Sequence, residues 1–507
     1  MMHLAFEVVD LAAAVAHARE LGAAEATVQP QENVRVLFHP AGHPFCLYTE
    51  QRSFPASAGN RLLAAYSPRV SDSGEHRAGL SRRLLRFVAE HPPPGPTRRD
   101  FWRSPLRGPW LTSILGSVLL AGITIVFVTG LLSYAAYNPD LGDNDTKSDV
   151  GLLSFYLFDW PTNPPWLYRL TQGAHVLIGL MLIPVLLGKL WSVIPKLFTW
   201  PPVRSIAHGL ERFSLLMLVG GAVFVFVTGV ANIQYWYVFP GSFYTVHFYA
   251  AWVFMAAFVV HVGLKLPVVV STLRTRSMGE LLRTDTAHTS AEPPDDYDLV
   301  SPDPSAPTLS RRGALALVGG GSALLFVVTA GQSFGGALRR TALLAPRFSD
   351  PGDGPNGFQV NKTAEELGIT DAAGDPAWRL ELQGVDIRRF DREGLRALPQ
   401  HTAALPIACV EGWSTAPQEW TGVRLADLAA LAGVEAPVSM LVESLQEGGF
   451  GSTTLRGNQV LDPDSLLALG VNGADLSLDH GFPARVIVPN NPGVHNTKWV
   501  TRLTFEA

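Results

Sequence analysis

The chain has 507 residues, of which 47% are hydrophobic and 16% charged, and its formal net charge is −5 at pH 7. This length allows several domains, and the composition is too apolar for a soluble enzyme of this size, so we expect a membrane section. The charge gives no reason to expect nucleic acid as a partner, and two cysteines exclude a disulfide framework in practice. Without a charged region followed by an apolar run at the start, no N-terminal signal peptide is expected, and the N-terminus should stay in the cytoplasm.

Residues 1–51 are predicted to form a small α+β module. Residues 3–9 have the pattern of a strand, and the alanine-rich residues 11–21 that of a helix. Residues 34–38 and 45–48 follow as two strands around a glycine-containing turn. The predicted order is therefore strand, helix, strand, strand.

The stretch from His39 to Cys46 gives this module its family likeness. It resembles one half of a glyoxalase-like (vicinal oxygen chelate) domain, in which His and Glu ligate a metal across two paired modules. The resemblance implies ligands at His3 and Glu50. Because the chain holds one such module, a complete metal site would need a second copy. We favour a truncated or regulatory remnant, or a start site placed too far upstream.

Residues 52–109 are predicted to be a linker rich in Arg, Pro, Ser and Gly. Its last residues, including Arg98, Arg99, Arg103 and Arg107, precede the first long apolar run. Such a basic flank marks the cytoplasmic side of a membrane helix. The chain is therefore expected to enter the membrane from inside.

Five apolar runs are each long enough to span a bilayer, which takes roughly 20 residues. They cover residues 111–134, 173–191, 213–233, 246–270 and 314–334. The loop after the first run is acidic, whereas the loops after the second and fourth runs are basic. Because cytoplasmic loops carry an excess of Lys and Arg, we expect the basic loops inside the cell and the chain after the fifth run outside it. Residues 276–309 then form a solvated cytoplasmic linker rich in Pro and Ser.

Three histidines lie within these runs. His175 is early in the second run, and His247 and His261 are fourteen residues apart on the fourth. Fourteen residues are close to four helical turns, so these two imidazoles share nearly one face, separated by about 21 Å. Polar groups inside a membrane are functional candidates by default, and haem iron takes axial imidazoles. A lone histidine could instead hydrogen-bond a neighbouring helix, but the set favours haem.

Residues 110–275, with this histidine pattern, resemble the haem b membrane domain of the cytochrome b561 or formate-dehydrogenase gamma-subunit type. The resemblance implies that His175, His247 and His261 are haem ligands. Three histidines suffice for one bis-histidine haem b, and a second haem lacks a clear fourth ligand. Depth in the membrane pairs His175 with His247, whereas the family pattern pairs it with His261, and the sequence leaves both open.

Residues 350–507 are predicted to be an α+β domain, large enough to bury its own core. Most of its elements are short strands, with short helices predicted at 426–432 and 465–469. The segment Pro406–Ser414 contains Cys409, preceded by apolar residues and followed by a glycine. This pattern places a thiol at a strand end, although a lone cysteine is ordinarily a small buried hydrophobe.

The cysteine segment and the following Trp420–Val423 resemble the molybdopterin-binding domain of sulfite-oxidase-like oxidoreductases, from about residue 358 to the end. The resemblance implies that the Cys409 thiolate, a soft ligand, binds molybdenum and is the catalytic residue. It further implies molybdopterin contacts from five residues, each of which could equally be an ordinary polar residue: Asn361, Arg485, Asn490, His495 and Lys498. Sulfite oxidases place an arginine shortly before the cysteine, and residues 403–408 hold no cation, which argues against sulfite.

Residues 310–340 are the fifth predicted membrane helix, which begins Ser310-Arg311-Arg312-Gly313. The arginine pair is either an ordinary basic flank or an internal twin-arginine export signal. The second alternative suits a domain that folds around molybdopterin in the cytoplasm before it crosses the membrane. The twin-arginine machinery is then an expected partner.

The predicted fold class is multidomain: an α-helical membrane bundle of five helices, an α+β molybdopterin domain and a small α+β N-terminal module. The predicted function is that of a multi-pass oxidoreductase of a bacterial cell membrane with its C-terminal domain on the outer face. It would exchange electrons between membrane quinone, haem b and molybdenum, with an S-oxide as the substrate by analogy. The competing hypothesis is a non-enzymatic haem b carrier or redox sensor with a degenerate C-terminal domain.

Overall fold

The computed structural model describes residues 4–8, 10–29, 34–39, 44–48, 91–141, 144, 155–203, 205–234, 236, 243–294, 299–345, 355–448 and 450–507. It divides into two compact units, Met1–His91 and Pro92–Ala507. The predicted metal ligands His3 and Glu50, and residues 52–90 of the predicted linker, lie outside the described residues.

The described residues of the first unit form a four-stranded sheet and one helix. Its elements are β1 (Leu4–Glu7), α1 (Leu11–Glu20), β2 (Ala24–Glu25), β3 (Val34–Phe38) and β4 (Pro44–Tyr48). The strand order is β1-β4-β3-β2, with β1 parallel to β4. Val15, Leu37 and Leu47 form its small core. The predicted strand–helix–strand–strand order is confirmed, with one additional short strand, β2.

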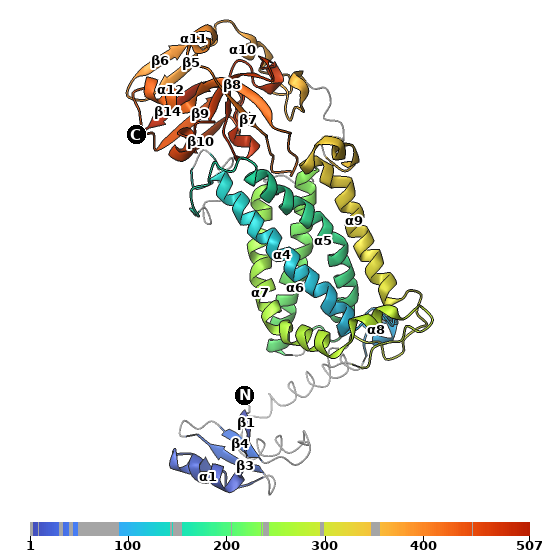
Figure 1. The fold of residues 1–507 in the computed structure, drawn as a ribbon. Coiled ribbons are helices and arrows are strands. Elements are labelled where there is room, and N and C mark those ends of the chain that lie inside the picture. The colour runs from blue at the N-terminus through green and yellow to red at the C-terminus, as the bar shows by residue number, and fades with distance from the viewer. Residues whose placement is uncertain are drawn as a thin grey trace. The chain divides into compact units, whose positions relative to one another are not determined.

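The second unit begins with five long helices (Figure 1). They are α4 (Pro109–Tyr137), α5 (Leu167–Leu197), α6 (Ile206–Ile233), α7 (Phe243–Thr275) and α9 (Arg311–Phe334). All five are long and apolar enough to cross a membrane. Large apolar side chains on their outer faces are exposed, such as Leu187, Leu264 and Leu324. A helix that is apolar all round is stable in lipid or in a protein core, so these faces fit a bilayer.

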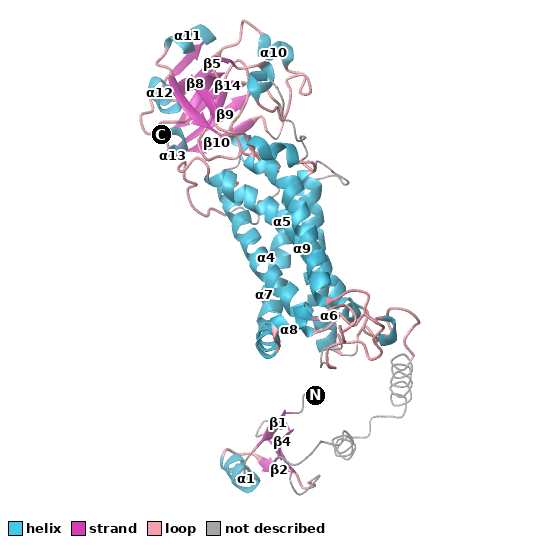
Figure 2. Cartoon of the chain, turned by 45° about the vertical axis from the view of Figure 1, so that its right-hand side comes forward, coloured by secondary structure: helices cyan, strands magenta, loops and turns pink. Residues whose placement is uncertain are grey.

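The fifth helix packs along the second, as Figure 2 shows for α9 and α5. Small residues allow the close approach: a β-carbon at Gly188 would lie 3.1 Å from Val318, and one at Gly321 would lie 3.4 Å from Pro184. The Ser322 hydroxyl donates a hydrogen bond of 2.7 Å to the Met181 carbonyl. Small side chains and hydroxyl bonds are the usual means of helix association in lipid.

The segment 276–309, expected to be solvated, is partly folded against the start of the bundle. After α8 (Met278–Arg283), the buried Glu292 carboxylate accepts hydrogen bonds of 3.3 and 3.2 Å from the Trp110 backbone N–H. It also pairs with Arg276. A carboxylate is stabilised at a helix N-terminus by the free N–H groups there. The linker therefore caps α4 and is not a free spacer over its described length.

The C-terminal part contains two five-stranded sheets. One has the order β10-β9-β14-β5-β6, and several of its strands are labelled in Figure 1. The other has the order β12-β11-β8-β7, and its fifth strand, β13, pairs with β11. The strands are β5 (Leu380–Gln383), β6 (Ile387–Phe390), β7 (His401–Leu405), β8 (Gln418–Arg424), β9 (Ser439–Ser444), β10 (Ser452–Arg456), β11 (Leu466–Val471), β12 (Ala474–Asp475), β13 (Arg485–Ile487) and β14 (Val500–Glu506). The helices are α10 (Thr370–Gly374), α11 (Arg392–Ala397), α12 (Leu425–Leu431) and α13 (Gly457–Val460).

One predicted helix of this domain is wrong. Residues 466–469 of this segment belong to β11, which pairs with β8, β12 and β13. Its residues from Leu466 to Leu469 are almost fully buried. A short apolar run reads equally as a strand or as a helix, and burial on both faces of a sheet decides for the strand. The predicted helix at 426–432 is confirmed as α12.

Candidate active site and histidine pocket

Cys409 lies on a tight loop that follows β7. Its backbone N–H donates to the Trp413 carbonyl and its carbonyl accepts from the Gly412 N–H, both at 3.0 Å. Gly412 has a φ of +85°, a left-handed conformation that glycine adopts without strain. Residues 409–414 are called the cysteine loop below. The loop holds the thiol in the interior, with 6% of Cys409 exposed.

A second segment runs beside the thiol. The Gly493 N–H donates a 2.7 Å hydrogen bond to the Ala408 carbonyl, and Ala408 also bridges to Pro492 in parallel. A β-carbon at Gly493 would lie 3.7 Å from the Cys409 sulfur. The tail that follows β13, which contains most of the predicted cofactor residues, therefore passes directly next to the predicted metal ligand.

Buried polar atoms without partners gather in the segments that flank the cysteine. Among the described residues, seven such atoms have no hydrogen-bond partner: Gln359 Nε2, Trp413 Nε1, Arg485 Nε, Asn491 Nδ2, His495 Nδ1, His495 Nε2 and Thr497 Oγ1. A buried donor left unsatisfied costs about 1–3 kcal/mol, so a native protein rarely keeps several without a ligand. These side chains fit a polar cofactor such as molybdopterin.

Arg485 supplies the charge for such a cofactor. Its side chain is buried, and its Nη1 donates to the His480 carbonyl at 3.2 Å. No carboxylate pairs with it in the described part of the chain. Burial lowers the pKa of its guanidinium to about 9, so it keeps its charge at neutral pH. A buried cation without a counter-ion fits a phosphate, which a guanidinium binds with two parallel hydrogen bonds.

His495 also lies in this interior. Its ring meets that of Tyr137 from α4 edge to face, with 5.7 Å between centroids. Burial lowers the pKa of His495 to about 4, and the Tyr137 backbone offsets this only in part. The imidazole is therefore neutral at pH 7 and has one donor and one acceptor for a ligand.

Lys498 joins two segments of the predicted cofactor site. Its ammonium donates to the carbonyls of Lys362 and Asp479, each at 2.8 Å. Lys362 follows Asn361, which is half-buried. The Lys498 side chain thus holds the predicted pterin segment against the tail.

His480 and Asn490 have structural partners. Nε2 of His480 lies 3.2 Å from the Gln359 carbonyl, and its ring stacks on Phe358 with centroids 3.8 Å apart. The Asn490 amide accepts from the Tyr168 N–H at 2.5 Å and donates to the Pro161 carbonyl at 2.6 Å. Asn490, expected to contact the cofactor, therefore binds the start of α5 through its oxygen and the segment before α5 through its nitrogen.

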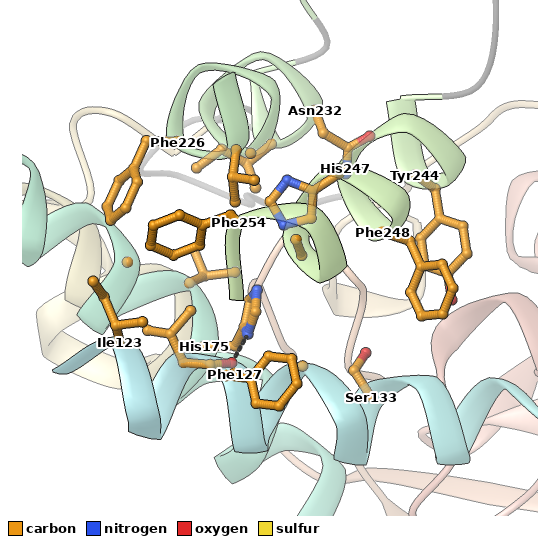
Figure 3. Close-up of a pocket in the computed structure, with 18 of the residues that line it drawn as sticks. Ile123, Phe127, Ser133, His175, Phe226, Asn232, Tyr244, His247, Phe248 and Phe254 are labelled. Carbon is orange, nitrogen blue, oxygen red and sulfur yellow. Dashed lines mark hydrogen bonds between the residues drawn. The ribbon is translucent and has the colours of Figure 1, made fainter. Parts of the chain in front are cut away.

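A pocket between α4, α5, α6 and α7 contains two of the three histidines (Figure 3). The rings of His175 on α5 and His247 on α7 have centroids 6.4 Å apart and planes at 74°. The pocket holds about 1330 Å³ of space free of protein atoms, part of it open to the outside. Its other lining residues are mostly apolar and aromatic, as in cofactor sites. His261 does not line it.

The Nδ1 atoms of both rings are held in the same way. His175 Nδ1 lies 2.9 Å from the Val126 carbonyl and 3.3 Å from the Thr129 hydroxyl. His247 Nδ1 lies 3.2 Å from the Thr228 hydroxyl. An imidazole that donates from Nδ1 presents the lone pair of Nε2 to a metal. Both histidines therefore have Nδ1 engaged by a neighbouring helix, and both line one pocket.

The sequence contains a signal for this pairing that the spacing of the histidines does not reveal. The five residues Val-Phe-Val-Thr-Gly occur at 126–130 on α4 and again at 225–229 on α6. Each copy supplies the threonine beside one histidine and a glycine against its ring. A β-carbon at Gly130 would lie 3.1 Å from His175 Cε1, and one at Gly229 would lie 3.3 Å from His247 Cε1. The repeat therefore marks α4 and α6 as the helices that pack against the rings of His175 and His247.

Comparison with known proteins covers the two ends of the chain. Residues 368–507 match the family described as oxidoreductase molybdopterin binding domain, and residues 1–48 match a glyoxalase-like domain. The uncharacterised oxidoreductase YuiH of Bacillus subtilis is 32% identical over 130 residues, which are 25% of this chain and 65% of that protein. The mitochondrial sulfite oxidase of Drosophila melanogaster is 32% identical over 155 residues, 25% of this chain and 26% of that one. The NADPH nitrate reductase of Phytophthora infestans is 41% identical over 99 residues, 18% and 11% of the two chains.

A solved structure, that of the sulfane dehydrogenase SoxCD from Paracoccus pantotrophus, covers 26% of this chain and 38% of that chain at 26% identity, with a TM-score of 0.24. The chain spans 65% or less of the length of these relatives. Neither family match reaches the five helices, so the haem-binding resemblance stays a prediction. Residues 368–507 are a molybdopterin-binding oxidoreductase domain with sulfite oxidase and nitrate reductase homologues, carried on a chain with a glyoxalase-like N-terminus and five helices apolar enough to cross a membrane.

Proposed function

We propose that the protein is a membrane-bound, molybdopterin-dependent oxidoreductase that passes electrons between a membrane quinone, one haem b and a molybdenum centre. The observation that carries this proposal is that the histidine pocket reaches the cysteine loop, because Val410 lines the pocket and is bonded to Cys409. A one-electron carrier in the pocket would therefore lie close to the predicted metal ligand.

The distance between the two histidines fits a single haem iron. Two metal–nitrogen bonds of about 2 Å each, together with the half-widths of two imidazole rings, span roughly 6 Å. The His175 and His247 centroids are 6.4 Å apart. The glycines against both rings leave room for them, and the apolar lining suits a porphyrin. We therefore assign His175 and His247 as the two residues that would hold the haem iron, with one haem rather than two.

At the other centre, the chain's residues hold and orient the cofactor. The Cys409 thiolate would bind the metal, while Arg485 and the polar tail would bind the phosphate and pterin. Molybdenum, when bound, supplies oxygen-atom transfer coupled to two electrons. The tail and the cysteine loop keep bulk water from the site, since the residues from Ala484 to Asn491 are buried.

The proposed substrate is a neutral S-oxide. Residues 403–408 before Cys409 contain no cation to hold an anion such as sulfite. Reduction of an S-oxide to a sulfide takes up two electrons and two protons and releases water. Oxidation of a quinol releases two electrons and two protons, so the two half-reactions balance.

The proposed location is a bacterial cell membrane, with the N-terminus inside and the C-terminal domain outside. The basic flanks of alternate loops support this orientation. Arg311 and Arg312 at the start of α9 would direct export by the twin-arginine machinery. Arg311 is buried and donates to the Ser290 carbonyl at 2.8 Å, so this arginine also anchors the linker.

The test is reduction of methionine sulfoxide by the purified protein with a quinol as the donor. Turnover that accompanies oxidation of a haem b spectrum supports the proposal. Turnover by protein that contains no haem would limit the function to that of a molybdoenzyme without a haem electron carrier. Haem without molybdenum or turnover would support the competing function, an electron carrier or redox sensor.

A further inference from the structure

The cysteine loop is bonded to the ends of two membrane helices. From α5, the Gln172 amide donates to the Val410 carbonyl at 2.5 Å. From α9, the Ser333 hydroxyl donates to the Gly412 carbonyl at 2.6 Å. In return, the Ser414 hydroxyl donates to the Ser333 carbonyl at 2.8 Å. Helices α5 and α9 therefore each donate a hydrogen bond to a backbone carbonyl of the cysteine loop.

Two further contacts fix the loop in place. Arg339, in the short helix η3 (Gly336–Thr341) after α9, donates from Nη1 to the Ser414 carbonyl at 3.2 Å. Under the loop, a β-carbon at Gly412 would lie 2.8 Å from the Val176 β-carbon, so no side chain fits there. The hydrogen bonds from α5, α9 and η3, together with the close contact between Gly412 and Val176, fix the position of this loop against α5.

Gln172 is the residue that links the loop to the histidine pocket. It lies three residues before His175 on α5, so both side chains share one face of the helix. Gln172, His175 and Val410 all line the pocket. From His175, a route of one helical turn, one hydrogen bond and one peptide unit therefore leads to Cys409.

We infer that the bundle and the molybdopterin domain form a fixed electron bridge and that Gln172 is its positioning residue. This inference rests on the proposed function, because it assumes haem in the pocket and molybdenum at Cys409. Each transfer towards substrate would move one electron from haem, when bound, to molybdenum. Two transfers would supply the two electrons for one S-oxide, and the two protons that it takes up from the solvent would equal the two that quinol oxidation releases. No movement of the domain is needed between transfers.

The test uses a flash of light and a photoreductant to place one electron on the haem of the full-length protein, so that no substrate is required. Partial reoxidation of the haem then reports transfer to molybdenum. Gln172→Leu removes the Val410 hydrogen bond and keeps the size of the side chain. Gln234→Leu is the matched control, because the Gln234 amide donates to the Leu344 carbonyl at 2.7 Å, outside the cysteine loop.

We expect Gln172→Leu to slow the haem reoxidation by about tenfold, since small misplacements in a preorganised site have large effects on rate. Haem and molybdenum contents are measured in each variant, and the reoxidation rate is compared only in protein that holds both groups. Gln234→Leu should match the wild type in haem content, molybdenum content and turnover driven by a soluble dye. If Gln172→Leu does not fold, Ser333→Ala removes the bond to Gly412 and should slow the same phase.

A reoxidation rate unchanged in both variants overturns the inference, as does a wild-type protein that holds both groups and shows no reoxidation. Loss of dye-driven turnover in Gln172→Leu also overturns it, because the residue would then support the molybdenum site itself. A wild-type protein without haem overturns the proposed function instead, so the two failures are distinct.

Discussion

The imidazole rings of His175 and His247 face one another across 6.4 Å, although they belong to different helices of the bundle. Each is held through Nδ1 by a threonine of the neighbouring helix, Thr129 or Thr228. Since both threonines belong to the same five-residue repeat, the two halves of the pocket are built alike. The pairs α4–α5 and α6–α7 thus use the same sequence for the same contact, which supports a symmetric bis-histidine site.

The first prediction concerns this pair. His175→Ala and His247→Ala should each remove most of the haem b absorbance of purified protein, because one imidazole is not enough for a six-coordinate iron. His261→Ala should retain it, since His261 does not line the pocket. His288→Ala, a change at the exposed partner of Asp285, is the surface control. Loss of haem in His261→Ala with retention in His247→Ala would show that the pairing is His175 with His261.

The second prediction concerns the glycines of the repeat. Gly130→Val and Gly229→Val should lower haem content several-fold. A β-carbon at these positions would lie only 3.1 or 3.3 Å from the imidazole, so the larger valine side chain would displace the ring. Gly320→Val on α9 is the control, since no atom lies within 4 Å of its β-carbon position. The measurement is haem absorbance per protein. Equal haem content in all three variants would refute a role for these glycines in positioning the rings.

The third prediction concerns the thiol. Cys409→Ser should lower turnover by roughly a hundredfold or more, because a hydroxyl is a poor replacement for a soft thiolate ligand. Loss of a residue that only hydrogen-bonds a metal ligand already lowers activity by about 10–100-fold. Haem absorbance and the thermal midpoint should be nearly unchanged, as the side chains are similar in size. Cys46→Ser in the first unit is the control. Full activity of Cys409→Ser would exclude metal binding by this residue.

The sequence predicts features that depend on local pattern. Five helices follow from the length of the apolar runs. Cys409, predicted at the end of a strand, lies instead on the loop that follows β7, which ends at Leu405. Features set by distant residues were not predictable in this way. Glu292 caps α4 from a segment that reads as solvated, and Asn490 binds the start of α5. The β11 strand was predicted as a helix because burial on two faces is decided by its partner strands.

The fourth prediction concerns pH. Burial, aided by the charge of Arg485, lowers the pKa of His480 to about 3. Above pH 6.5 the ring is neutral whether the chain is folded or unfolded. As the pH falls below 6.5, the unfolded chain takes up a proton that the folded chain does not. The free energy of unfolding should therefore decrease by about 1.4 kcal/mol per pH unit from this residue, or about 2 kcal/mol by pH 5.

Pulse proteolysis of the full-length protein in urea at two pH values measures this effect. His480→Gln should reduce the pH dependence of the C-terminal domain relative to the wild type. An identical pH dependence in wild type and His480→Gln would show that His480 is not kept neutral by the fold.

The most direct test of the central claim, that one chain joins a haem and a molybdenum centre, is their quantification in the purified membrane protein. Molybdenum and iron are measured by elemental analysis, haem by its pyridine complex and pterin by fluorescence after oxidation. We predict one molybdenum, one pterin and one haem b per chain, with the haem lost in His247→Ala and the molybdenum in Cys409→Ser. Protein that is fully folded but contains haem without molybdenum, or molybdenum without haem, would contradict the account.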